Sequence, residues 1–183
     1  MSDQPRSDTI DDVLLRMHLR IESTGWALTT AEAGPEAPCW TYTTGLCARF
    51  GHPELIVASV GAERAADLID RLCGSIRDGE RFVTGREVDA GGGVAHLVEV
   101  HPAQFDTAFS RWYRYYGSID SSVPTLQALQ VVVPDVWFPE GRAGTQPRLD
   151  APGPVLGRGR AKRAERPTGF RAGPSRPVRP RRW

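Results

Sequence analysis

Apolar residues recur at helical spacing in three stretches of the chain, residues 10–21, 62–76 and 102–116. Apolar positions every three or four residues place a stripe along one side of a helix, and such a stripe packs against a core. We therefore predict three helices. In the third helix the spacing leaves Tyr115 on the outer face. The residues on its core-facing stripe are Phe105, Ala108, Phe109, Trp112, Tyr113 and Tyr116.

Six shorter stretches have the composition of β-strands. They are rich in β-branched, aromatic and other apolar residues, and most are bounded by Gly, Pro or Asp. The predicted strands span residues 26–32, 39–46, 55–60, 80–89, 94–100 and 126–133. The first two are joined by a turn rich in Gly and Pro and are expected to pair antiparallel. Strands with short links, interrupted by helices, favour an α+β fold with a mixed or mostly antiparallel sheet.

These elements define one folded domain between two flanking segments. Residues 1–8 are polar and are predicted to be flexible, and residues 9–140 form the α+β domain. Residues 141–183 are rich in Arg, Pro and Gly, and such a segment buries too little apolar surface to offset its ordering entropy. We predict that it is disordered. No apolar run approaches the roughly 20 residues that span a bilayer, and no secretory signal begins the chain, so we expect a cytoplasmic protein.

The net charge of +1 conceals an acidic body and a basic tail. Residues 1–154 contain 13 Arg against 21 Asp and Glu, a net charge of −8, whereas residues 155–183 contain ten basic residues against Glu165, a net charge of +9. One interpretation is a tail that binds nucleic acid or another polyanion. Others are a weakly constrained Arg-rich tail and a tail that docks on the acidic body. The candidate tail residues are Arg158, Arg160, Lys162, Arg163, Arg179, Arg181 and Arg182.

Metal and cofactor motifs are absent from the sequence. The three cysteines form no CxxC pair, which disfavours a zinc site or a disulfide framework, and we expect reduced thiols. The glycine run at residues 91–93 lacks the pattern of a phosphate-binding loop. We predict no metal and no cofactor. The role of His96 is open, and His101 precedes Pro102 in a position that suits a helix cap.

The residues able to do chemistry are densest between positions 39 and 55. On a strand the side chains alternate, so Trp40, Tyr42 and Thr44 share one face. His52 and Glu54 follow in the next loop. Our leading hypothesis is a domain that binds a small ligand or a protein partner through segment 40–55. Its candidate binding residues are Trp40, Tyr42, Thr44, His52 and Glu54, with Asp135 and Trp137 closing the pocket.

Two alternatives stay open. One is an enzyme site in which His52 is the general base and Glu54 orients it, because a neutral histidine beside a carboxylate can accept a proton near neutral pH. Tyr42 or Thr43 would then donate to the substrate. In the other, the same aromatic residues serve only core packing across strands, and His52 serves only a turn. An exposed patch of aromatic residues would favour a homodimer, because dimerisation would bury it.

Three groups of residues resemble a known family. Tyr42-Thr43-Thr44-Gly45-Leu46 matches a Tyr-Thr-x-Gly-Leu segment, and Gly51-His52-Pro53-Glu54-Leu55 matches the Gly-His-Pro-Glu-Leu that comes after it. Gly25-Trp26, Gly79, Gln130, Pro134-Asp135 and Phe138-Pro139 also match. Over residues 10–140 the chain resembles the bacterial family of domain of unknown function 4262. The resemblance implies a small bacterial cytoplasmic domain and no particular reaction.

One stretch departs from that family's pattern. Its members tend toward Gly-x-Phe-Pro-Trp near the end of the domain, where this chain has Val136-Trp137-Phe138-Pro139-Glu140. The basic tail lies outside the region of resemblance.

Overall fold

A computed structural model describes residues 10–31, 39–119, 122–137 and 146–152. The helices are α1 (Ile10–Thr24), α2 (Leu46–Phe50), α3 (Ala62–Arg77), α4 (Phe105–Ala108) and α5 (Ser110–Ser118). The strands are β1 (Ala27–Ala31), β2 (Trp40–Thr44), β3 (Glu54–Ala58), β4 (Glu87–Asp89), β5 (Val94–Glu99) and β6 (Ala128–Val132). Two single turns of 3-10 helix are η1 (Pro102–Gln104) and η2 (Asp135–Trp137).

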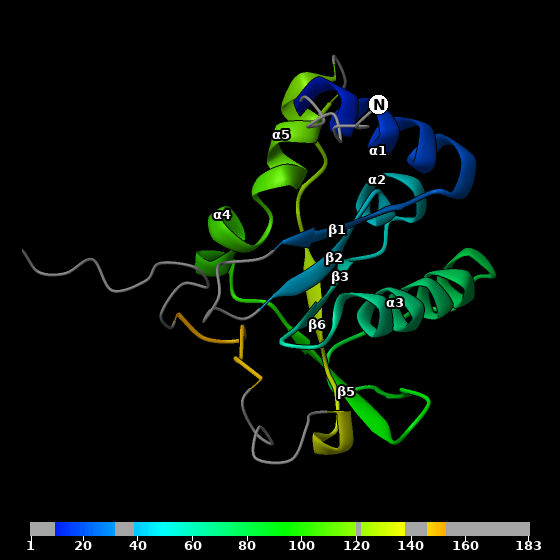
Figure 1. The fold of residues 1–183 in the computed structure, drawn as a ribbon, viewed down its shortest axis with the longest axis vertical. Helices are drawn as coiled ribbons and strands as arrows, with labels where there is room; N and C mark the ends of the chain where they lie inside the picture. Colours follow the sequence, from blue (N-terminus) through cyan, green and yellow to red (C-terminus); the bar gives the residue numbers. More distant parts are fainter. Residues whose placement is uncertain (1–9, 32–38, 120–121, 138–145, 153–183) are drawn as a thin grey trace, which may run out of the picture.

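The six strands form one open sheet in the order β1-β2-β3-β6-β5-β4 (Figure 1). Every neighbouring pair is antiparallel except β3 and β6, which run parallel with Ile56 opposite Gln130. Because β3 and β6 point the same way, both begin at the end of the sheet near α2. The prediction of an α+β fold with a mostly antiparallel, mixed sheet is confirmed.

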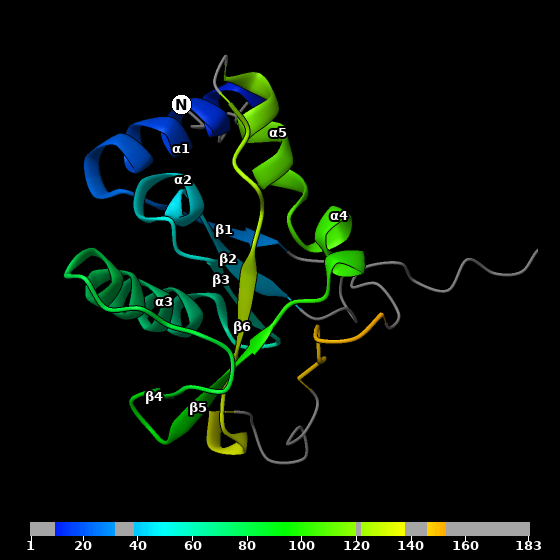
Figure 2. The ribbon, with the colours of Figure 1, turned by 180° about the vertical axis from the view of Figure 1, so that it is seen from behind.

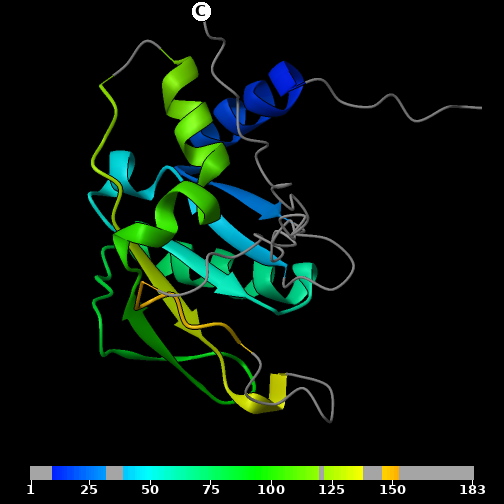
Figure 3. The same ribbon diagram turned by 90° about the vertical axis from the view of Figure 1, so that its left-hand side faces the viewer.

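Each face of the sheet is covered by its own core. On one face α3 packs its apolar stripe, which includes Leu68, Leu72 and Ile76, against Leu55 and other strand residues. On the other face α1, α4 and α5 enclose a second core. Figure 3 views the molecule with α4 and α5 in front of the sheet and α3 behind it. The central strand β3 is buried on both faces, as expected of a continuous apolar strand in a parallel pair.

Two predicted elements differ from the structure. The strand predicted at residues 80–89 is reduced to β4 at its end, because Phe82 turns into the α3-side core and residues 80–86 run irregularly beside β5. Gly85 donates to the Leu97 carbonyl there, at 2.7 Å. Residues 46–50, expected in a strand end and a loop, form the short helix α2.

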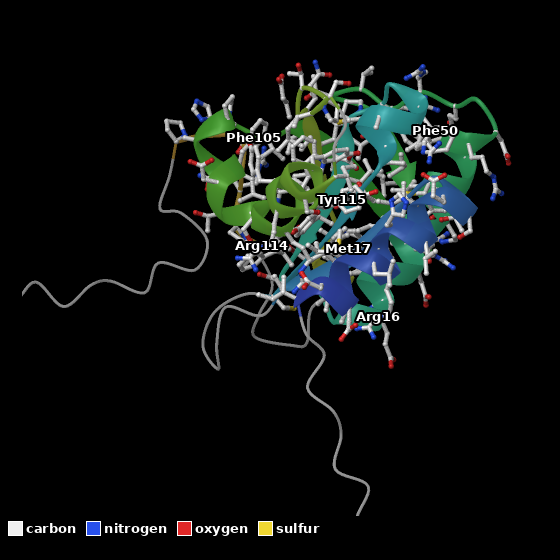
Figure 4. All side chains as sticks on the ribbon, turned by 90° about the horizontal axis from the view of Figure 1, so that it is seen from above. Arg16, Met17, Phe50, Phe105, Arg114 and Tyr115 are labelled. Atoms are coloured by element: carbon white, nitrogen blue, oxygen red, sulfur yellow. The ribbon has the colours of Figure 1, made fainter. Side chains whose placement is uncertain are left out.

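The third predicted helix is divided, and two of its tyrosines lie on faces other than those expected. Phe109 has φ −118° and ψ 30°, so the chain leaves helical geometry between α4 and α5. In α5, Tyr115 is buried against α1, with its hydroxyl 3.1 Å from His18 Nδ1, whereas Tyr113 is 40% exposed. Figure 4 shows Tyr115 on α5 lying beside α1. The expectation that Tyr113 packs inward and Tyr115 outward was wrong.

The C-terminal side of the predicted domain boundary also contributes to the core. Leu149, in the segment predicted to be disordered, is only 1% exposed and packs with the α4–α5 face of the sheet. The buried amide of Gln130 holds this segment, because Nε2 donates to the Pro147 carbonyl and Oε1 accepts from the Leu149 amide. The disorder prediction therefore fails for residues 146–152. The rest of the tail, including every candidate basic residue, and residues 1–8 lie outside the described residues.

None of the helices in the described part of the chain is both long enough and apolar enough to cross a membrane.

Candidate functional site

The buried carboxylate of Glu54 organises the loop between β2 and β3. Glu54 is fully buried at the start of β3, and its oxygens accept five hydrogen bonds of 2.7–3.2 Å. Oε1 accepts from the Gly45 and Cys47 amides and from Trp112 Nε1. Oε2 accepts from Thr43 Oγ1 and the Leu46 amide. Three of these donors are the backbone N–H groups that begin α2, so Glu54 serves as the cap of that helix.

The Glu54 carboxylate is stabilised by N–H and O–H donors and not by a cation. Among the described residues no ion pair joins it to a basic side chain. Burial raises the pKa of its carboxyl, while the hydrogen bonds from Thr43, Cys47 and Trp112 act in the opposite direction. All five contacts are donors, which suits a carboxylate. The five hydrogen bonds offset part of the desolvation cost of this charge.

The imidazole of His52 fixes the turn that precedes β3. His52 is 1% exposed and lies between two backbone groups. Its Nδ1 is 2.7 Å from the Pro53 carbonyl, and the Phe82 amide donates to Nε2 at 3.0 Å. This pattern requires a neutral ring with the proton on Nδ1. Burial lowers the pKa of His52, which favours the same neutral form.

An open pocket of about 470 Å³ lies beside this turn. Gly51, His52 and Pro53 form one wall, and Arg81 reaches across to donate to the Gly51 carbonyl at 2.7 Å. The opposite wall comes from the irregular segment before β4, from the end of β5 and from the start of β6. Its residues include Phe82, Val83, Thr84, Glu99, Gln127 and Leu129. The pocket thus combines apolar surface with a carboxylate, a guanidinium, an imidazole, an amide and a hydroxyl.

This pocket lies within the part of the chain that matches a known family. Residues 20–142 match the family model described as domain of unknown function (DUF4262). The chain belongs to the DUF4262 family. A search of curated proteins and a search of solved structures found no match.

Trp40, Tyr42 and Glu54 of the DUF4262 domain lie on the face of the sheet that α5 covers. Trp40 Nε1 donates to the Ala108 carbonyl at 2.9 Å, and the Tyr42 hydroxyl accepts from the Arg111 amide at 3.2 Å. Both rings are core residues, and burial raises the pKa of Tyr42. None of the three lines the pocket beside the Gly51–Pro53 turn.

The remaining candidates divide between two ends of the sheet. His52 packs edge-to-face on Phe82 on the α3 side, and Thr44 is fully buried at the end of β2. Asp135, which is exposed, and Trp137, which is buried, belong to η2 beyond the far end of β6. In Figure 1 η2 is the yellow turn at the bottom, while α2 and the turn after it lie in the upper half. The structure therefore brings neither Asp135 nor Trp137 to the pocket of His52.

The arrangement that the enzyme alternative needs is not formed by the described residues. Glu54 makes no hydrogen bond to His52, and both ring nitrogens of His52 are engaged with the backbone. Cys47, whose amide donates to Glu54, has its thiol pKa raised to about 12 by burial and by the charge of Glu54. No cluster of three or more His, Cys, Asp or Glu among the described residues could hold a metal ion.

The sequence pattern pointed to one wall of the pocket and missed the other. The missed residues lie in an irregular segment and at strand ends, which no motif marks. The 61% exposure of Val83 marks an unusual apolar surface, but it is known only from the structure. One minor expectation is confirmed: His101 Nδ1 accepts from the Ala103 amide and caps η1.

Proposed function

We propose that this DUF4262 domain binds a small ligand in the pocket beside the Gly51–Pro53 turn. The observation that carries the proposal is the buried hydrogen bonding around Glu54 and His52, which fixes that turn as one wall of an open pocket. A buried carboxylate without a cation is costly for stability. A domain can retain this loss of stability if binding requires the loop held by Glu54 to keep one conformation.

The lining of the pocket indicates what kind of ligand would fit. Pro53, Val83 and Leu129 offer apolar surface, and Glu99 and Gln127 offer acceptors at the rim. Ligand pockets combine mostly apolar walls with a few polar groups that set orientation. The fitting ligand is a small molecule with an apolar part and a hydrogen-bond donor or an amine for Glu99.

Binding is better supported than proton transfer at this pocket. His52 is the group that a general base would require, and its nitrogens hold Pro53 and Phe82. A general base must accept a proton, and here the free position is Nε2. A proton on Nε2 would face the N–H of Phe82, and two donors repel each other, so protonation of His52 is unfavourable. His52 acts here as a positioning residue.

Two exposed valines provide a matched test. Val83 lines the pocket and is 61% exposed, whereas Val94 is 48% exposed and lies outside it. We would screen a library of small organic fragments against the full nitrogen-labelled chain by two-dimensional amide NMR spectra. Hits are expected to shift the amides of Gly51, Thr84 and Gln127. Val83→Asp is expected to weaken binding roughly tenfold by placing a charge on the apolar wall.

Val94→Asp should bind the same fragments with unchanged affinity. The proposal is overturned if no fragment shifts the pocket amides, or if the fragments bind the Val83→Asp variant as tightly as the original chain.

A further inference from the structure

A second pocket lies at the other end of the sheet, where α3 faces the hairpin between β4 and β5. It has a volume of about 590 Å³. Arg64, Asp67, Asp70 and Arg71 of α3 line it together with Gly91 and Trp137. Figure 2 shows α3 and the β4–β5 hairpin on the same side of the molecule. The Gly51–Pro53 turn contributes nothing to this pocket, so a ligand here is independent of the function proposed above.

The indole of Trp137 presents a hydrogen-bond donor that the described residues do not satisfy. Trp137 is only 7% exposed, and its Nε1 is buried without a partner. Buried indole N–H groups usually find an acceptor, because leaving one unpaired costs free energy. An oxygen from a bound ligand would supply the missing acceptor.

Two arginines meet the indole around the Gly91–Gly92 turn. A methyl group at Gly92 would lie 3.5 Å from Trp137 Nε1 and 3.6 Å from Arg64 Nη2. A methyl group at Gly91 would lie 3.1 Å from Arg71 Nη2. The absence of side chains at both glycines therefore leaves space beside the indole nitrogen and the two guanidinium groups.

Both guanidinium groups keep N–H groups available. The Arg64 guanidinium carbon lies over the Trp137 ring, 4.0 Å from its centroid, and no hydrogen bond from Arg64 occurs among the described residues. Arg71 donates from Nη2 to the Ala90 carbonyl at 3.0 Å, which anchors its side chain beside the turn. No ion pair joins either arginine to a carboxylate among the described residues.

The two aspartates restrict the charge of the ligand. Asp70 accepts from Trp26 Nε1 at 2.7 Å and lines the pocket together with Asp67. Two carboxylates beside two guanidinium groups leave the pocket close to neutral, so it offers little net attraction to offset the desolvation of a doubly charged phosphate, which costs more than that of a singly charged carboxylate. A planar carboxylate also matches the paired N–H groups of an arginine.

We propose that this pocket binds small molecules that carry a carboxylate, whose oxygens accept hydrogen bonds from Arg64, Arg71 and the indole N–H of Trp137. Because the indole nitrogen is buried and the exposed Arg64 side chain lies over the ring, binding requires Arg64 to shift and open the indole nitrogen to the ligand. An amine on the same molecule would lie toward Asp67.

The test observes the indole N–H directly. The full nitrogen-labelled chain would be titrated with sodium acetate, succinate and glycine, with sodium chloride and sodium phosphate at equal ionic strength for comparison. The Trp137 indole signal is assigned as the one that disappears in Trp137→Phe. At least one of the carboxylates is expected to shift this signal in a saturable way, and neither chloride nor phosphate should reproduce the shift.

Arginine variants separate a binding site from a general effect of salt. Arg64→Gln and Arg71→Gln are expected to weaken binding of the active carboxylate roughly tenfold each, through loss of a charge-assisted hydrogen bond. Arg77→Gln, on the same helix but outside the pocket, should leave the affinity unchanged. The proposal is overturned if no carboxylate shifts the indole signal, if phosphate binds in preference, or if Arg64→Gln and Arg71→Gln bind as tightly as Arg77→Gln.

Discussion

At the scale of single residues, Glu54 is the only buried Asp or Glu in the described part of the domain. Its carboxylate is fully buried and is compensated by two side-chain and three backbone donors rather than by a basic residue. Both oxygens are acceptors only, so the site distinguishes a carboxylate from an amide of the same shape. Glu54 therefore fixes the position of α2 and, with it, the Gly51–Pro53 turn that forms the pocket wall.

Glu54→Gln is expected to destabilise the domain by about 2–4 kcal/mol. In either orientation the new NH₂ group opposes at least one backbone donor, at Gly45 and Cys47 or at Leu46. Urea unfolding measures the change in the free energy of unfolding. Glu87→Gln, an exposed glutamate on β4, should change it by less than about 0.5 kcal/mol. Equal stabilities for the two variants would contradict the role given to Glu54.

At the scale of elements, the corner between β2 and α2 decides where the pocket wall lies. Gly45 has φ +123°, a backbone conformation that residues other than glycine rarely adopt. A Cβ at this position would lie 2.6 Å from the Gly25 carbonyl oxygen and 3.2 Å from the Trp26 Cα. The corner thus packs directly against the chain between α1 and β1, and this contact sets where α2 begins.

Gly45→Ala and Gly51→Ala form a matched pair at the two ends of α2. Gly51 has φ +56°, and a Cβ there would meet nothing within 4 Å. We expect Gly51→Ala to cost about 1 kcal/mol, the ordinary cost of left-handed backbone. Gly45→Ala adds a clash with backbone atoms and should cost about 3 kcal/mol or more. Thermal and urea unfolding measure the stability of both variants. A similar loss of stability in the two would show that the backbone around Gly45 can relax to accept a Cβ.

At the scale of the whole molecule, the sheet separates two cores, and residues from distant parts of the chain close each one. The core that contains Trp40 and Tyr42 is completed by Leu149, which lies far along the chain from both. The His101 amide donates to the Leu149 carbonyl at 2.7 Å, which adds a second tie beside the Gln130 side chain. The folded unit therefore continues past the boundary that composition indicates.

Leu149→Ala should destabilise the domain by about 2–4 kcal/mol, because it leaves a cavity in the α4–α5 core. Leu15→Ala is the matched control, since Leu15 is 57% exposed on α1 and its replacement should cost less than about 0.5 kcal/mol. Urea unfolding compares the two variants. A loss at Leu149 no larger than that at Leu15 would mean that residues 146–152 add nothing to the core.

The periodicity of apolar residues was sufficient to predict the α+β class, the mixed sheet, α1, α3 and most strands. These elements have strong local patterns, and their stripes are long enough to be recognised without knowing their partners. The family was also recognisable from local motifs, because Tyr42–Leu46 and Gly51–Leu55 are contiguous in the sequence. The aromatic alternation along β2 was predicted as well, and it places Trp40 and Tyr42 in one core.

Only the tertiary structure decided which chemistry these residues can perform. The cap of α2 is a carboxylate that comes after the helix in the chain, so no rule based on neighbouring residues predicts that helix. Tyr115 is buried and Tyr113 exposed because α1 packs against α5 on the side of Tyr115, a contact that the spacing within one helix does not reveal. Trp137 lies far from His52 and beside Arg64 because it follows the C-terminal end of β6, whereas His52 lies near the start of β3 at the other end of the sheet. Local spacing determines elements, whereas a site is made by residues that only the packing of those elements brings together.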